Sequence, residues 1–237
     1  LSSLALVCPQ DPESAKRLQG LGARVGPQLN LKRIAAPPPD APRERERLKA
    51  LIGQRPVVLA ASTHPGDEDL ILAALPPGPL LIIAPRHPVR GPDLATQFRA
   101  RGYSLAQRSA GEPLEATTDI YLADTLGEMG LFFALADVTV MGGGFSSGIG
   151  GHNPLEPAWF ETAILTGPQA FNSAAVYDEM FDEMAALETT DLARDLKGLL
   201  DYPMVARRMG EAALTYVQRQ GAALDQTLAL LSPLLPA

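Results

Sequence analysis

Short apolar runs alternate along the chain with stretches of helical pattern. The runs are continuously apolar, which is typical of strands buried on both faces of a parallel sheet. The predicted strands are residues 57–61, 80–84, 103–107, 120–123, 138–141 and 163–166, and the predicted helices between them are 65–74, 92–101, 128–136 and 154–160. This order predicts an α/β fold, a Rossmann-like parallel sheet with helices on both faces.

The two ends of the chain add further expected elements. Residues 4–8 read as a short strand, and Asp11 followed by Pro12 starts a helix that ends at Gly22. Residues 29–34 read as extended. The sequence AAPPPDAP at 35–42 is a proline-rich linker and the predicted domain boundary. The remaining predicted helices are 43–52, 173–186, 191–200, 203–220 and 222–231.

A glycine-rich loop follows the predicted strand 138–141. It holds six glycines between Gly142 and Gly151, and a helix opened by Pro154 comes next. A strand, a glycine loop and a helix start present backbone N–H groups to an anion, and glycine lets a ligand approach the main chain. No G-x-G-x-x-G or G-K-[ST] pattern fits this loop, which argues against a nicotinamide fingerprint or a P-loop. A plain flexible connection is the weaker alternative.

Polar residues gather where the predicted strands end, and in a parallel sheet ligands bind beyond those carboxyl ends. All three histidines belong to this set, which points to a site that donates hydrogen bonds to a phosphate or carboxylate. Zinc ligation is the lesser alternative, because no H-x-x-x-H or C-x-x-C accompanies them. The candidate residues are Ser62, Thr63, His64, Arg86, His87, Asp124, Thr125, Gly127, Glu128, Gly150, Gly151, His152, Asn153 and Glu156. Asp124 has an alternative role as a helix cap.

Two acidic features have competing interpretations. Glu156 lies three residues after Asn153, as in a capping pair, but Pro157 weakens that reading and favours a ligand-binding carboxylate. The sequence Asp67-Glu68-Asp69 contains a D-x-D, which holds a metal in some nucleotide-sugar enzymes. These acids fall in the first turn of a predicted helix, where they complement the helix dipole, so we predict no metal site.

Composition narrows the class of protein. Of the 237 residues, 46% are hydrophobic and 20% charged, as in ordinary globular proteins. A formal charge of −7 argues against a nucleic-acid partner, and the single cysteine, Cys8, excludes an internal disulfide and fits a reducing compartment. No apolar run approaches the roughly 20 residues of a membrane span, and no signal peptide is visible. Because the chain starts at Leu1 within a predicted strand, we expect a piece of a longer protein.

Four segments together resemble a known family. They are ASTHPGDEDLIL (61–72), APRHPVR (84–90), DTLGEMGLFFALADV (124–138) and GGG…GIGGHNPLEPA (142–158). In this order and spacing the chain resembles the donor-binding half of 3-deoxy-D-manno-octulosonic acid (Kdo) transferase. That glycosyltransferase adds Kdo from CMP-Kdo to a lipid A precursor in lipopolysaccharide biosynthesis of Gram-negative bacteria. GLGARVGPQLNLK (20–32) is similar to the family's passage between its two domains.

The resemblance implies a GT-B architecture and a donor, CMP-Kdo, that is bound without a metal or other cofactor. It implies that residues 1–36 are a remnant of the acceptor domain with the crossover, and that residues 37–237 form the nucleotide-sugar domain. Arg86 and His87 would flank the cytidine and its phosphate, and Asn153 and Glu156 would bind the ribose hydroxyls. The 125–128 loop would contact the nucleotide through its backbone. The glycine loop and its helix would face the phosphate and the Kdo carboxylate. The floor of the cleft would be formed by Ser62, Thr63 and His64.

Two departures from the family pattern qualify this expectation. The family's acceptor site, acidic general base and membrane anchor belong to an N-terminal domain that this chain almost entirely lacks. We therefore expect this half to be inactive alone, and the full-length protein to lie at the cytoplasmic face of the inner membrane. Gly142-Gly143-Gly144 stands where the family tends to have Gly-Gly-Ser. Two alternatives to a Kdo transferase stay open. One is another GT-B nucleotide-sugar transferase or epimerase, and the other is a non-catalytic nucleotide-binding module.

Overall fold

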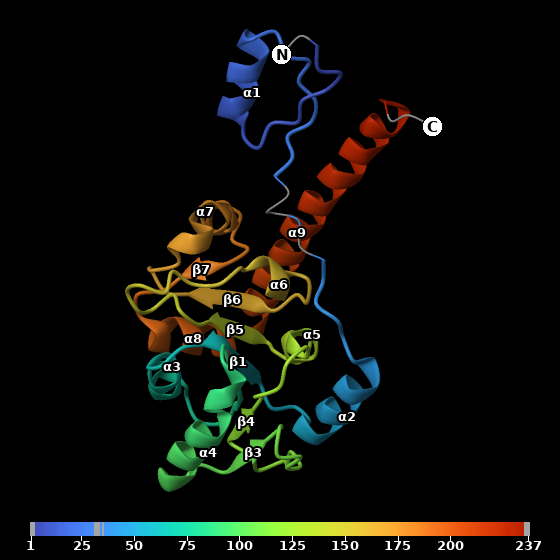
Figure 1. The fold of residues 1–237 in the computed structure, drawn as a ribbon. Coiled ribbons are helices and arrows are strands. Elements are labelled where there is room, and N and C mark those ends of the chain that lie inside the picture. The colour runs from blue at the N-terminus through green and yellow to red at the C-terminus, as the bar shows by residue number, and fades with distance from the viewer. Residues whose placement is uncertain (1–2, 31–33, 35, 235–237) are drawn as a thin grey trace. The chain divides into compact units, whose positions relative to one another are not determined.

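The chain divides into two compact units. The structure is a computed structural model that describes residues 3–30, 34 and 36–234. One unit takes in residues 1–36 and 215–237, and the other is Pro37–Leu214. The second unit carries the sheet and every candidate site residue (Figure 1). That residues 1–36 are the remnant of another domain stays a prediction.

A parallel sheet forms the centre of the second unit. Seven strands pair in the described part of the chain, in the order β3-β4-β2-β1-β5-β6-β7, and each neighbouring pair is parallel. The predicted α/β fold is confirmed, and only β7 was not predicted. The strands are β1 Val57–Thr63, β2 Leu80–Pro85, β3 Leu105–Gln107, β4 Ile120–Leu122, β5 Val138–Met141, β6 Ala163–Thr166 and β7 Leu187–Glu188.

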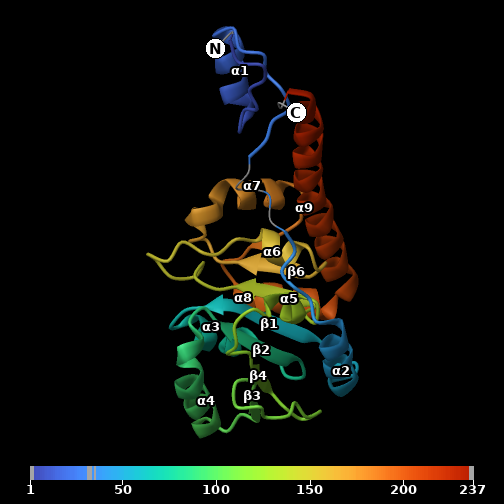
Figure 2. The same cartoon turned by 45° about the vertical axis from the view of Figure 1, so that its right-hand side comes forward.

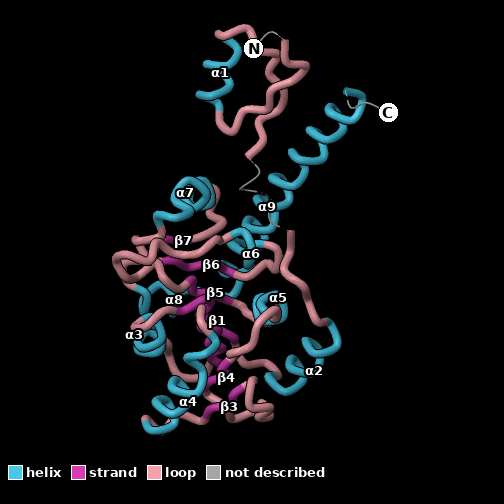
Figure 3. Tube along the Cα trace, in the orientation of Figure 1, coloured by secondary structure: helices cyan, strands magenta, loops and turns pink. Residues whose placement is uncertain are grey.

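Helices cover both faces of this sheet. Figures 1 and 2 show α3, α4 and α8 on one side, and α2, α5 and α6 on the other. Figure 3 shows how the helices alternate with the strands along the trace. Their bounds are α2 Pro42–Ile52, α3 Asp67–Ala74, α4 Gly91–Ala100, α5 Met129–Phe133, α6 Leu155–Ala158, α7 Ala174–Asp182 and α8 Leu192–Asp201, with short 3-10 turns η2 Pro88–Arg90 and η3 Phe171–Ser173.

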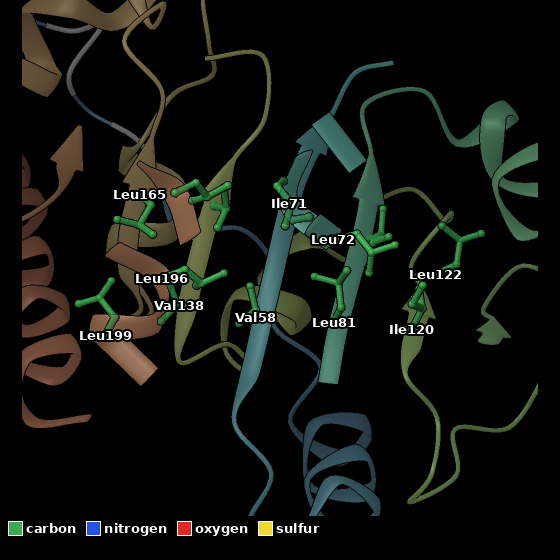
Figure 4. Close-up of a cluster of buried hydrophobic side chains, with 14 of the residues drawn as sticks. Val58, Ile71, Leu72, Leu81, Ile120, Leu122, Val138, Leu165, Leu196 and Leu199 are labelled. Carbon is green, nitrogen blue, oxygen red and sulfur yellow. The ribbon is translucent and has the colours of Figure 1, made fainter. Parts of the chain in front are cut away.

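One hydrophobic cluster fixes the layer formed by α3, α4 and α8 on the sheet. Alternate strand residues such as Val58, Leu81 and Val138 point toward this layer, because successive side chains of a strand face opposite sides. Ile71 of α3 and Leu196 of α8 pack against them, and all five are fully buried (Figure 4). Truncating one such side chain to Ala costs about 2–5 kcal/mol of stability. This packing holds the carboxyl ends of the strands in a fixed register.

The N-terminal segment departs in part from the prediction. Helix α1 (Pro12–Gly20) forms as expected, and the Asp11 carboxylate accepts a hydrogen bond from the Ser14 backbone N–H at 2.7 Å. The predicted strand at 4–8 is wrong, because only one isolated bridge forms, between Val7 and Val25. A strand requires a continuous partner, and this segment has a single paired residue. Residues 31–33 of the predicted extended stretch 29–34 lie outside the described residues.

The C-terminal helices also differ from the prediction. Helix α8 forms near the predicted position and is capped by Asp191, but the helices predicted at 203–220 and 222–231 are one helix, α9 (Pro203–Leu231), followed by a 3-10 turn, η4 (Ser232–Leu234). Gly221 lies inside α9, where an internal glycine costs about 1 kcal/mol without breaking the helix. Within the described residues, no helix combines the length and the apolar character that a membrane crossing requires.

Candidate functional site

The three histidines meet at the carboxyl edge of the sheet. The Nε2 atoms of His64 and His152 are 2.9 Å apart, and their rings stack with centroids 5.1 Å apart. The His87 ring stands nearly perpendicular to that of His64, with centroids 6.1 Å apart. These residues come from the loops after β1, β2 and β5, so the structure brings together strand ends that are 88 positions apart in the sequence. The expectation that the three histidines lie together at the strand ends is confirmed, whereas their role in binding a ligand stays a prediction.

The end of β1, directly before His64, is irregular. Ser62 has a φ of +55°, and the pairing with β2 shifts register between Ala61 and Thr63. This irregularity turns the chain so that Thr63 is completely buried, and its hydroxyl donates to Glu68 Oε1 at 2.6 Å. The Thr63 side chain therefore bonds within the protein interior, whereas Ser62 is partly exposed and its backbone hydrogen-bonds with His152.

Two residues follow β2 on the open side of the site. The Arg86 backbone N–H donates to the Thr63 carbonyl at 3.0 Å, which continues the β1–β2 ladder by one residue. The side chains of Arg86 and His87 are exposed. The guanidinium of Arg86 thus supplies a positive charge that can reach an anion at the sheet edge.

A pair of buried acids, Asp67 and Glu68, supports the loops of the site. Asp67 Oδ2 accepts hydrogen bonds from the backbone N–H groups of His64 and Gly143, each at 2.8 Å, so one carboxylate joins the β1 and β5 loops. Glu68 is 3% exposed and forms an ion pair with Arg90, whose Nη1 lies 2.7 Å from Oε1. Their position in the sequence predicted only that these acids complement the helix dipole, and not that they support the loops. No local signal separates them from exposed Asp69, which pairs with a surface arginine.

The glycine loop after β5 is a hydrogen-bonded structure rather than a loose connection. The Gly142 N–H donates to Ala61 O at 2.8 Å, and the Gly151 N–H donates to Gly143 O at 2.9 Å. Asn172 Nδ2 donates to Ile149 O at 2.8 Å from the segment after β6. A Cβ at Gly142 would lie 2.6 Å from the Ser62 carbonyl, so this close approach requires glycine. Gly150 and Gly151 have φ values of +89° and +71°, which also favour glycine.

Helix α6 places Glu156 beside this loop. The helix begins at Leu155, and Asn153 Oδ1 accepts from the Leu155 N–H at 3.1 Å, so the capping pair of Asn153 with Glu156 does not form. Pro157 lies in the first turn of α6 and is tolerated there, because the N–H that proline lacks would have no intrahelical partner. Glu156 is an exposed residue. Partial desolvation of its carboxyl raises the pKa of Glu156, while the positive charge of Arg86 acts in the opposite direction.

The loop after β4 lies two strands away from β1 in the sheet. Thr125 donates its hydroxyl to Glu128, and Arg108 Nε donates to Glu128 Oε2 at 2.7 Å. Gly127 has a φ of +82°. These donors occupy the Glu128 carboxylate within the protein.

Asp124, directly after β4, does not cap α5. Its carboxylate accepts from Gln107 Nε2 at 2.7 Å and from the Ser109 backbone N–H at 2.9 Å. Helix α5 instead begins after Glu128. Asp124 therefore holds the end of β3 against β4.

Electrostatics keep the stacked histidines neutral at pH 7. Burial lowers the pKa of His64, with further lowering by the charges of His87, Arg90 and Arg86 and an opposing effect of Asp67. Burial, His64 and Arg86 together lower the pKa of His152 to about 4. One ring of the Nε2–Nε2 pair therefore donates and the other accepts. Among the residues that the structure describes, no three His, Cys, Asp or Glu side chains are grouped to hold a metal ion.

No family model matches the sequence. The chain is 31% identical to a 3-deoxy-D-manno-octulosonic acid transferase of Haemophilus influenzae, over 99% of this chain and 58% of the relative. It is 32% identical to the enzyme of Bordetella pertussis, over 96% of this chain and 56% of the relative. The chain thus spans a little over half the length of these curated relatives.

A solved structure decides the family. The crystal structure of the C-terminal CMP-Kdo binding domain of WaaA from Acinetobacter baumannii is similar with a TM-score of 0.64 and 32% identity, over 77% of this chain and 96% of that domain. The chain belongs to the 3-deoxy-D-manno-octulosonic acid transferase family. This membership confirms the resemblance carried by the four motif segments. It also confirms the expected Rossmann-like sheet of a GT-B C-terminal domain, and it disfavours other GT-B transferases and epimerases.

Proposed function

We propose that this chain is the donor-binding domain of a Kdo transferase, which holds CMP-Kdo during transfer of Kdo to a lipid A precursor. One observation carries the proposal: Arg86, the histidine cluster and the hydrogen-bonded glycine loop converge at one sheet edge. They do so in a chain related, at 32% identity, to a CMP-Kdo binding domain. Guanidinium, imidazole and backbone N–H groups are the donors that phosphate and carboxylate groups prefer.

The proposed roles of the side chains follow from their positions. Arg86 and His87 flank the cytidine and its phosphate, since both are exposed beside the stacked histidines. The Glu156 carboxylate accepts hydrogen bonds from the ribose hydroxyls, and the Asn153 amide hydrogen-bonds with the same hydroxyls. The glycine loop faces the phosphate and the Kdo carboxylate. The 125–128 loop contacts the nucleotide through its backbone. Thr63 acts indirectly, through its buried bond to Glu68.

We propose that donor binding requires no metal. Charge develops on the leaving phosphate during glycosyl transfer, and fixed donors can stabilise it in place of a divalent ion. Arg86 supplies a full positive charge, and the backbone N–H groups of the glycine loop supply partial ones. Binding of CMP should therefore be the same in EDTA as in MgCl₂, and a requirement for added Mg²⁺ would contradict this part of the proposal.

The rest of the enzyme's chemistry is proposed to lie outside this chain. A general base must deprotonate the acceptor hydroxyl, and the acceptor and the membrane must be engaged. We assign these tasks to the half of the relatives that this chain does not span. The 237-residue chain alone should bind CMP without transferring Kdo, and measurable transfer to a lipid A precursor would overturn this assignment.

Isothermal titration calorimetry with CMP and UMP tests the proposed donor. We expect CMP to bind more tightly than UMP, and no binding or a preference for UMP would overturn the proposal. Glu156→Ala should weaken CMP binding about tenfold or more, which corresponds to the loss of hydrogen bonds to a charged group. Glu46→Ala is the matched control, because Glu46 is an exposed helical glutamate of α2. If the two substitutions change the CMP affinity equally, Glu156 does not bind the nucleotide.

A further inference from the structure

Arg108 forms a hub between three parts of the second unit. Its side chain is only 15% exposed. The guanidinium donates to Glu128 through both Nε and Nη2, while Nη1 donates to the Tyr121 hydroxyl at 2.8 Å and to Glu44 Oε1 at 3.1 Å. It also lies over the Phe132 ring, 5.6 Å from the centroid. One side chain thus connects the 125–128 loop, the end of the sheet and helix α2.

The 125–128 loop depends on this hub for its shape. Both carboxylate oxygens of Glu128 are occupied by Arg108, and Oε2 also accepts from the Thr125 hydroxyl. The bond to Arg108 is the main cause that lowers the pKa of Glu128, so the pair stays charged at neutral pH. Leu126, at the loop tip, is 81% exposed and provides no anchor of its own. The backbone groups of the loop are therefore fixed chiefly by contacts at its two ends.

Helix α2 holds the other side of the hub. Glu44 accepts from Arg108 and, through both oxygens, from Arg47 at 2.8 Å, and these bonds lower its pKa to about 2. The proline segment that leads into α2 also touches α5 just after the loop. A Cβ at Gly130 would lie 2.3 Å from the Pro39 carbonyl, so backbone meets backbone there. Helix α2 thus contacts the hub through Glu44, and the proline segment before it contacts the start of α5.

We propose that Arg108 is a positioning residue for the donor: it holds the 125–128 loop in the shape that receives the nucleotide and couples that shape to helix α2. This inference rests on the proposed function, in which the loop contacts the nucleotide. Arginine suits the task because its planar fork can bind Glu128 with two nitrogens while a third bond reaches Glu44. A lysine retains the charge but cannot make this set of bonds. Arg108 itself is not assigned a contact with the donor.

The test compares substitutions that cut different arms of the hub. Arg108→Lys breaks the fork on Glu128, and Glu44→Ala removes only the arm to α2. Arg47→Ala is the matched control, because it breaks the Glu44–Arg47 pair and leaves the Glu44–Arg108 bond. We expect Arg108→Lys to weaken CMP binding about tenfold, within the usual range of coupling between sites. Glu44→Ala should weaken it by a smaller factor, and Arg47→Ala should leave it unchanged.

Hydrogen exchange without ligand provides a second measurement. Amides of residues 125–130 should exchange faster in Arg108→Lys and Glu44→Ala than in the parent chain or in Arg47→Ala, with the core strands unchanged. Equal loop exchange and equal CMP affinity in all four proteins would overturn the inference. If Arg108→Lys does not fold, Glu44→Ala decides alone. If the parent chain does not bind CMP, the proposed function fails, whereas the exchange result still decides whether Arg108 orders the loop.

Discussion

The ion pair between Glu68 and Arg90 offers a sharp test of how the site is supported. Glu68 is 3% exposed and accepts from Arg90 Nη1 at 2.7 Å, from Arg90 Nη2 at 3.1 Å and from the Thr63 hydroxyl at 2.6 Å. The Arg90 side chain is 21% exposed. Arg90→Met keeps the bulk of the side chain and removes the charge. It leaves a buried carboxylate with one neutral donor.

The expected loss is large because an uncompensated charge remains buried. Breaking a buried pair by removing one partner costs about 3–5 kcal/mol, and the partial exposure of Arg90 favours the lower figure, about 3 kcal/mol. For a domain of this size that corresponds to a fall in Tm of roughly 6–12 °C. The double variant Glu68→Gln/Arg90→Met should be more stable than Arg90→Met, since a neutral amide can still accept from Thr63.

Thermal and urea unfolding followed by circular dichroism measure these differences. Lys197→Met is the control, because Lys197 forms an exposed ion pair with Asp201 on α8, and it should change stability by no more than about 0.5 kcal/mol. Equally small stability losses in Arg90→Met and Lys197→Met would contradict a cost of leaving the Glu68 charge unpaired. That cost is also contradicted if the double variant is less stable than Arg90→Met, because the buried charge is then not the cause.

Three further outcomes follow from the site. The pKa of His152 is about 4 in the folded protein against 6.5 for an unperturbed histidine, so the stability of the protein should fall as the pH drops from 6.5 to 4. This fall should be less steep in His152→Gln, and parallel curves of Tm against pH for the two proteins would contradict this. Gly142→Ala should cost about 1–3 kcal/mol in urea unfolding, because its Cβ meets the Ser62 carbonyl, whereas Gly198→Ala, with open space in α8, should stabilise by about 0.5–1 kcal/mol. Asn172→Ala should weaken CMP binding with little change in Tm, because the Asn172 side chain holds the glycine loop through a hydrogen bond. An unchanged CMP affinity in calorimetry would contradict a contact between that loop and the donor.

Most of the architecture of the second unit could be predicted from hydrophobic periodicity along the chain. The predicted strands at 138–141 and 163–166 match β5 and β6, because a buried parallel strand must be apolar on both faces and this pattern is local. The positions of the histidines also follow from sequence, since chain order fixes which residues come after each strand. Because parallel strands end at a common edge, the pattern could predict that His64, His87 and His152 meet.

Which polar residues face each other depends on tertiary packing and could not be predicted from the sequence. Asp67, Glu68 and Asp69 are equivalent in a linear pattern, yet the first two are buried and the third is exposed, because helix rotation against the sheet sets their burial. The Arg108 hub joins residues from β4, α2 and the 125–128 loop, and their pairing depends on how the helices pack. A local apolar pattern likewise predicted a strand at 4–8 that lacks a continuous partner. Hydrophobic periodicity is a property of neighbouring residues, whereas hydrogen-bond partners and burial are set by segments that only folding brings together.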